Sequence, residues 1–131
     1  MAPTPEQFRD VAELRAALRR FLRRSGEISK RNGLTPRYHL LLLMIKGAPD
    51  ETERSTVTEL ADRLQLTQST VTQLVQRAER DGLVAREPSP SDGRVVYLKL
   101  TDEGERRLSA SVDEHGAERD LLFEIVSRIN P

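Results

Sequence analysis

The segment between Thr58 and Gly82 constrains the fold of this chain more than any other. Thr58 precedes a short amphipathic stretch, and Thr67 precedes a second one, over about residues 67–81, that ends at Gly82. A threonine caps the exposed amides at the start of a helix, and a glycine accepts the left-handed conformation that often ends one. Only two residues separate the stretches. The segment therefore predicts two short helices joined by a tight turn.

The start of the first of these helices has two interpretations. Residues 55–57 are rich in β-branched side chains, which is typical of a small strand, and Thr58 then caps the helix. In the other interpretation Thr56 is the cap, and Glu59 completes a capping box with it. We favour Thr58, because Val57 then continues the strand.

A β-hairpin is predicted after the second helix. Residues 83–87 are typical of a strand, and residues 94–100 alternate between apolar and polar side chains. Residues 88–93 lie between them and contain two prolines and an Asp-Gly pair, which favour a turn. Helix, tight turn, helix and hairpin, in that order, predict a winged helix-turn-helix with its wing over residues 83–100.

The second helix has the composition of a helix that reads DNA. A major groove about 12 Å wide admits a helix, glutamine pairs with adenine edges, and serine and threonine both donate and accept. The first acid on this helix is Glu79. An ordinary solvated helix face looks similar, but the hairpin that follows favours DNA. The predicted DNA contacts are Gln68, Ser69, Thr72, Gln73, Gln76 and Arg77.

The tip of the predicted wing carries Asp92 and Arg94. An arginine at a wing tip can enter a narrow minor groove, where the negative potential is enhanced. Asp92 is costly near phosphate unless it is paired, so we expect it to anchor the tip by bonding Arg94, Arg86 or turn amides. The alternative is a plain hairpin turn with a surface ion pair, worth under ~1 kcal/mol.

Two long amphipathic segments flank this unit. Residues 1–34 begin with a Thr-Pro helix start and repeat apolar side chains in steps of three and four. Thr101 caps a last segment, residues 102–131, predicted as one helix of about 40 Å that ends near residue 129. A domain this small cannot cover both apolar stripes alone. We therefore expect these segments to form a dimerisation lobe.

The DNA-binding lobe is expected over residues 35–101. It includes a helix at residues 38–45, which are apolar nearly all round and therefore buried, and a loop at 46–53. The charges of the chain are unevenly divided, although the net charge is zero. Residues 1–47 carry ten basic and four acidic side chains, and residues 102–131 carry four and eight. The two ends can therefore pair within or between chains.

Composition excludes several classes of function. Cysteine is absent and there are two histidines, which argues against disulfides, thiol chemistry and a zinc site. No glycine-rich phosphate loop, nucleophile elbow or metal-ligand cluster indicates an enzyme, so we expect no catalytic residues, no cofactor and no metal. No apolar run is long enough for a membrane span, and the N-terminus has no apolar region behind a basic one, so we expect no secretory signal. We expect a cytoplasmic protein.

Five segments of the chain carry a resemblance to a known family: 58–61, 67–75, 81–86, 91–94 and 98–104. They resemble the MarR (multiple antibiotic resistance regulator) family, whose members are dimeric winged helix-turn-helix transcription factors and mostly repressors. The resemblance implies that Arg94 is the wing arginine with Asp92 as its anchor, and that Arg37 is a looser candidate for a phosphate contact. It also implies that Gln68, Ser69, Thr70, Thr72 and Gln73 read the major groove.

The resemblance also implies an effector, since small aromatic or phenolic anions often bind between the two lobes of such proteins. Tyr38, His39 and Arg15 are candidates for lining such a crevice, but His39 and Tyr38 also suit plain packing, and no effector residue is assigned. Many members end with one more helix, and this chain ends about where that helix would begin. Because the sequence has no cysteine, the sensing of oxidants through a thiol, which some family members use, is not expected here.

The sequence predicts a mainly α, single-domain protein over residues 1–131 with a small β-wing. We expect it to be a sequence-specific, homodimeric DNA-binding regulator, a repressor that binds a palindromic operator in double-stranded DNA and is released by a small molecule. The alternative is a winged-helix module for protein interaction, such as an antirepressor without operator binding. That alternative predicts acidic or apolar side chains on the outward face of the second helix, and these are not seen there.

Overall fold

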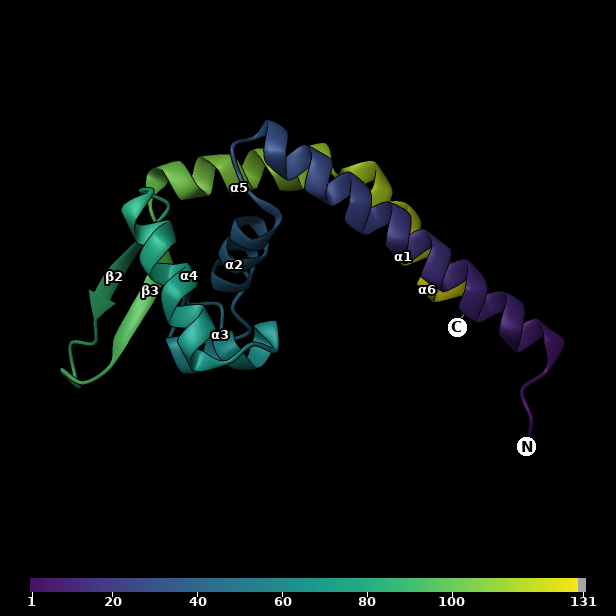
Figure 1. The fold of residues 1–131 in the computed structure, drawn as a ribbon, viewed down its shortest axis with the longest axis horizontal. Helices are drawn as coiled ribbons and strands as arrows, with labels where there is room; N and C mark the ends of the chain where they lie inside the picture. Colours follow the sequence, from purple (N-terminus) through teal and green to yellow (C-terminus); the bar gives the residue numbers. More distant parts are fainter. Residues whose placement is uncertain (130–131) are drawn as a thin grey trace.

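The computed structural model describes residues 1–129, and the last two residues of the predicted domain lie outside the described part. It contains a compact lobe, made of α2, α3, α4 and a small sheet, and a long arm, in which α1 and α6 lie side by side (Figure 1). Helix α5 runs from the lobe to the arm. This mainly α arrangement with a β-wing confirms the predicted fold class.

The arm is an antiparallel pair of helices. Helix α1, Pro5–Arg31, begins at Thr4, whose side chain and backbone form a capping box with Gln7. Helix α6, Gly116–Ile129, packs along it. Salt bridges join the two helices at Arg24–Glu118, where the nitrogen and oxygen are 3.1 Å apart, and at Arg128–Glu13. These pairs explain how the basic and acidic ends of the chain meet within one protomer.

The predicted single helix from Thr101 to about residue 129 is wrong. Thr101 caps α5 as expected, but α5, Asp102–Glu114, ends at His115, and α6 starts at Gly116 with a different direction (Figure 1). The His115 ring packs against Phe21 of α1, with ring centroids 4.3 Å apart. Glycine is a poor helix former, so a bend here costs little and lets α6 bury Ile125 in the arm.

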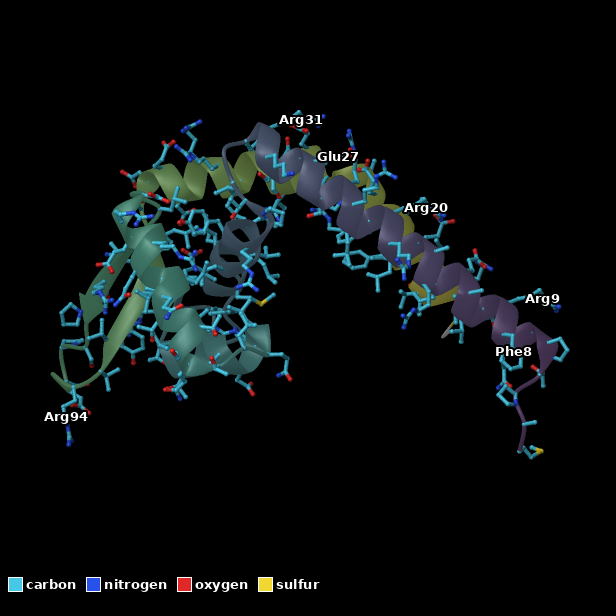
Figure 2. The ribbon with its side chains drawn as sticks, in the orientation of Figure 1. Phe8, Arg9, Arg20, Glu27, Arg31 and Arg94 are labelled. Carbon is cyan, nitrogen blue, oxygen red and sulfur yellow. The ribbon has the colours of Figure 1, made fainter. Side chains whose placement is uncertain are left out.

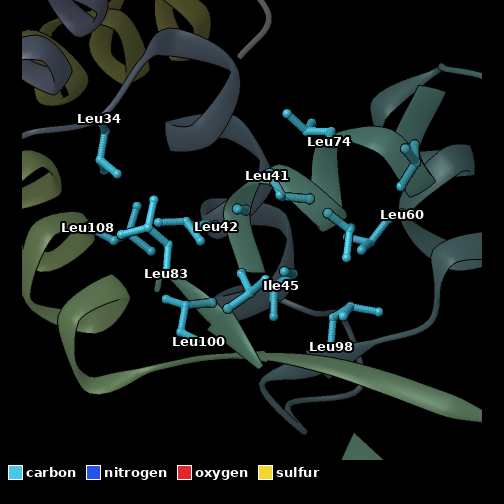
Figure 3. Packing of buried hydrophobic residues seen from close by; sticks show 14 of the residues in the cluster. Leu34, Leu41, Leu42, Ile45, Leu60, Leu74, Leu83, Leu98, Leu100 and Leu108 are labelled. Carbon is cyan, nitrogen blue, oxygen red and sulfur yellow. The ribbon is translucent and has the colours of Figure 1, made fainter. Parts of the chain in front are cut away.

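The lobe is built around α2, Pro36–Lys46, whose Leu41, Leu42 and Ile45 are fully buried. Helices α3, Val57–Leu64, and α4, Gln68–Arg80, pack against its buried side. The prediction of burial nearly all round is wrong for Leu40 and Leu43, which are 43% and 36% exposed on the side away from this core. Figure 3 shows Leu41, Leu42 and Ile45 meeting Leu60, Leu74, Leu83 and Leu98 in one cluster. The core therefore fixes how α4 is presented on the outside of the lobe.

The sheet has three antiparallel strands in the order β1-β3-β2. Strand β1 is Arg54–Ser55, β2 is Val84–Pro88 and β3 is Val96–Leu100. The hairpin β2–β3 forms the wing, with Pro88 opposite Val96 at its outer end. The predicted hairpin is confirmed, with its strands shifted by one or two residues.

The N-cap of α3 is Thr56, so the prediction of Thr58 is wrong. The Glu59 amide donates to the Thr56 hydroxyl at 3.2 Å, and the Thr56 amide donates to the Glu59 carboxylate at 3.0 Å. This capping box satisfies two backbone donors at once, which a cap at Thr58 cannot do. The strand accordingly ends at Ser55 rather than continuing through Val57.

The ends of α4 agree with the sequence. Gln65 takes the left-handed conformation, with φ 55°, in the turn that joins α3 to α4. Thr67 then caps α4 by accepting from the Thr70 amide at 3.1 Å. Gly82, with φ 76°, follows the C-cap residue Asp81. Local hydrogen bonds thus fix both the beginning and the end of this helix.

Candidate nucleic-acid interface

Helix α4 has one buried face and one exposed polar face. Val71, Val75 and Ala78 are fully buried, and Leu74 is nearly so. The opposite side chains are exposed, except for Thr70 and Thr72, which are half-buried. The predicted DNA-contacting residues therefore share one side of the helix: Gln68, Ser69, Thr70, Thr72, Gln73, Gln76 and Arg77.

The second half of this face is a shallow depression of about 510 Å³, lined by Gln73, Gln76, Arg77 and Arg80. The sequence reasoning missed Arg80 as a member of the face. Its position four residues after Gln76 and three after Arg77 is the signal that points to it, because such residues are neighbours on a helix. The face therefore ends with two guanidinium groups.

The acids at the end of α4 are both paired. Arg86 of β2 donates from Nε to the two carboxylate oxygens of Glu79, at 3.0 and 3.1 Å. The Tyr38 hydroxyl donates to Asp81 at 2.7 Å, and this bond holds the pKa of Asp81 below its usual range. Pairing reduces the repulsion that these carboxylates would exert on a nearby phosphate.

Arg86 was predicted as one of the possible partners of Asp92, and it pairs with Glu79 instead. The reason is geometric, because Arg86 lies in the inner half of β2 opposite Leu98, whereas Asp92 lies in the loop beyond Pro88. Arg86 thus ties the base of the wing to the predicted recognition helix.

The wing tip has the geometry expected of an anchored arginine. The backbone amide of Arg94 donates to Asp92 Oδ1 at 3.0 Å, and the Arg94 Nε lies 3.5 Å from the same oxygen. The Arg94 side chain is 94% exposed and projects from the end of the wing (Figure 2). Asp92 therefore orders the tip, while the guanidinium of Arg94 remains accessible to a ligand.

A second cluster lies across the sheet, and the sequence did not predict it. The Arg54 guanidinium lies 4.1 Å from the centre of the Tyr97 ring and 3.0 Å from the Glu87 carboxylate. Lys99 bonds the other oxygen of Glu87 at 3.0 Å, which is the main reason that the pKa of Glu87 is lowered. The cluster joins all three strands, because Arg54 lies in β1, Glu87 in β2, and Tyr97 and Lys99 in β3.

The three candidates for an effector crevice do not meet within one protomer. Tyr38 faces Asp81 at the end of α4, and Arg15 is exposed on α1. His39 lines a separate cavity of about 180 Å³ with His115. Burial lowers the pKa of both histidines, and each has a buried ring nitrogen without a hydrogen-bond partner among the described residues.

Arg37, the candidate for a looser phosphate contact, lies exposed in the first turn of α2. Its role is a prediction that the geometry leaves open. Within residues 1–129 the histidines and acidic side chains form no group of three or more suited to a metal ion. Each helix in the same range is too short or too polar to span a membrane.

The arm exposes a row of large apolar side chains. On α1 this row includes Phe8 (Figure 2), which is 64% exposed, and on α6 it includes Phe123, which is 62% exposed. Side chains of this size are normally buried, and exposed apolar surface gathered on one arm marks a candidate interaction site. The arm row, as we call it, consists of Phe8, Val11, Leu18, Leu22, Leu121, Phe123 and Val126.

Two helices joined by a tight turn and followed by a hairpin beside the second helix define a winged helix-turn-helix protein. The sequence model described as MarR family matches residues 32–95, from the end of α1 into the wing. The chain belongs to the MarR family of transcriptional regulators.

Relatives extend this assignment along the chain. The HTH-type transcriptional repressor YetL of Bacillus subtilis is 33% identical over 92 residues, which cover 70% of this chain and 54% of YetL. An uncharacterized HTH-type transcriptional regulator of the same organism, YsmB, is 32% identical over 125 residues, which cover 92% of this chain and 83% of YsmB. The chain spans about half the length of YetL and of several other relatives.

A solved structure supports the same fold. Sco3205, a MarR family transcriptional regulator from Streptomyces coelicolor, was crystallised in complex with DNA. It matches this chain with a TM-score of 0.68 and 27% identity, covering 93% of this chain and 76% of Sco3205.

Proposed function

We propose that this protein is a dimeric, sequence-specific DNA-binding repressor that acts in the cytoplasm and binds a palindromic operator. The observation that carries the proposal is the exposed polar face of α4 beside an anchored wing arginine, with the neighbouring acids paired. The relative YetL is named a repressor, and Sco3205 was crystallised with DNA. Both support the same class of function for this chain.

The proposed complex places α4 in the major groove. Its first turns present Gln68, Ser69 and Gln73 to base edges, where glutamine can pair with adenine. Arg77 near the end of the helix is placed to neutralise phosphate, and Arg94 to enter the adjacent minor groove. The face thus divides into base-reading residues and residues that bind the backbone.

We propose that the arm row is covered by a second copy of the chain. Burying these side chains removes a large apolar surface from water, which favours association. A two-fold dimer of this kind presents two copies of α4, and a palindromic operator requires them to be about 34–36 Å apart, one turn of DNA. A small aromatic or phenolic effector that changes this spacing would release the DNA.

The Gln73→Ala variant tests base reading. We expect affinity for the operator to fall by about 1–3 kcal/mol and preference to relax at one or two positions, because one bidentate pair with a base is lost. Polarisation titrations with the operator and its single-position variants measure this. Equal weakening on the operator and on shuffled DNA would contradict base reading and assign Gln73 to the backbone.

Two wing variants test the anchored arginine. Arg94→Ala is expected to weaken binding and to lower the salt slope by about one counterion, because one phosphate-neutralising cation is lost. Asp92→Ala should also weaken binding, although it removes a negative charge, because the tip loses its hydrogen bond to the Arg94 amide. Titrations at several salt concentrations distinguish the two variants, because only Arg94→Ala is expected to lower the salt slope. Tighter binding by Asp92→Ala would contradict the anchoring role.

A further inference from the structure

The end of α4 borders a groove of about 550 Å³ between the start of α2, the turn after α1, and α5. Within it the Tyr38 hydroxyl reaches from the first turn of α2 to Asp81, with 2.7 Å between the two oxygens. The ring is half-buried. This is a long-range contact, since the two residues are separated by 43 positions in the sequence.

Asp81 is the C-cap residue of α4. Its backbone amide donates to the carbonyl oxygen of Arg77 at 2.9 Å. A shift of Asp81 therefore shifts the turn that carries Arg77 and Arg80. Both guanidinium groups lie close enough to the Tyr38 hydroxyl that their charge acts on it.

The Tyr38–Asp81 hydrogen bond keeps the same donor and the same acceptor across physiological pH. Burial and the Asp81 carboxylate raise the pKa of Tyr38, while the tyrosine holds the pKa of Asp81 low. The phenol thus remains the donor and the carboxylate the acceptor. A hydrogen bond to a charged acceptor is stronger and more directional than a neutral one.

Two other contacts act at this end, one on the chain after α4 and one on the last turn of the helix. Thr101 donates from its hydroxyl to the Gly82 carbonyl at 2.6 Å and from its amide to the Leu83 carbonyl at 3.1 Å. Arg86 fixes the wing to Glu79. Tyr38 supplies the corresponding tie between α2 and the capping residue of α4.

We infer that Tyr38 is a positioning residue for DNA recognition, which fixes the last turn of α4, and with it Arg77, through its hydrogen bond to Asp81. The inference rests on the proposed function, because it assumes that Arg77 binds DNA. It assigns a role in binding to a residue that lies outside both the recognition helix and the wing.

The test is Tyr38→Phe, which keeps the ring and removes the hydroxyl. We expect operator affinity to fall by about three- to tenfold, the size of one ordinary hydrogen bond, while the protein stays folded. Thr52→Val is the matched control. The Thr52 hydroxyl also donates to an aspartate at 2.7 Å, Asp50 in the loop before β1, which lies outside α4 and the wing, so this variant should bind the operator with unchanged affinity.

A double-mutant cycle separates positioning from a general structural effect. Tyr38→Phe combined with Arg77→Ala should bind no more weakly than Arg77→Ala alone, because the residue being positioned is already absent. Combined with Arg94→Ala, its effect should add. Operator affinity equal to wild type in Tyr38→Phe, or a loss that adds to that of Arg77→Ala, would overturn the inference and leave the proposed function intact. Wild-type protein that binds no duplex would overturn both.

Discussion

Replacing Phe123 by aspartate is expected to convert the proposed dimer into monomers and to remove most of the operator affinity. The side chain is 62% exposed on α6 of a single protomer, so the substitution leaves the fold of the protomer intact. In a dimer it places an unpaired carboxylate in an apolar interface, which costs several kcal/mol. Losing the link between two half-sites should reduce affinity by about a hundredfold or more.

Light scattering at micromolar concentration measures the assembly, and circular dichroism checks the fold. Ala16→Asp is the matched control, because it adds the same charge to the exposed polar face of α1, among Glu13, Arg19 and Arg20. It should remain dimeric and bind normally. A Phe123→Asp protein that remains dimeric at these concentrations would show that the arm row is not the dimer interface.

Gly104→Ala is expected to lower the free energy of unfolding by about 3 kcal/mol, the upper part of the range for overpacking. A Cβ on Gly104 would lie 2.2 Å from the carbonyl oxygen of Leu83, which is backbone and cannot rotate away. Helix α5 must then move from the junction between α4 and β2. Urea unfolding with an unchanged slope measures the loss.

The control for Gly104 is Gly93→Ala in the wing turn. A Cβ on Gly93 meets no atom within 4 Å, so we expect its stability to stay within about 0.5 kcal/mol of wild type. If Gly104→Ala is as stable as the Gly93 variant, the contact between α5 and the end of α4 is looser than described.

Helix starts were predictable where a cap lies within three residues of its partner. Thr4, Thr67 and Thr101 cap helices as predicted, and Thr35 caps α2 in the same way, because each accepts from the amide three positions later. Thr58 failed because Thr56 stands two residues before it, and the reciprocal bond to Glu59 decides between them. Where two threonines compete for the N-cap, the one that can form a capping box with an acidic residue three positions later is therefore the better prediction.

The bend at His115 was not predictable from periodicity. The large apolar side chains stop at Val112 and resume at Leu121, and one helix bridging that gap was the interpretation that the sequence favoured. The bend depends on α1, which lies about ninety residues away in the sequence and offers Phe21 to the His115 ring and Arg24 to Glu118.

In the candidate site, too, contacts between residues close in the sequence were predictable, and contacts between distant residues were not. The exposed face of α4 follows from its period, and the Asp92–Arg94 contact spans two residues, so both were within reach of the sequence. Tyr38–Asp81 spans 43 residues and the Arg54–Glu87 pair spans 33. Such contacts depend on the packing of the lobe, and no local pattern encodes them.

We propose that this chain reads a DNA sequence through α4 and the wing. The most direct measurement is a polarisation titration of the wild-type protein with duplex from the promoter of its own gene and with a shuffled duplex, at two salt concentrations. We expect the protein to bind the promoter duplex about a thousandfold or more tightly than the shuffled duplex, and both affinities to fall steeply with salt. Equal affinity for the two duplexes, or no binding to either, would contradict it.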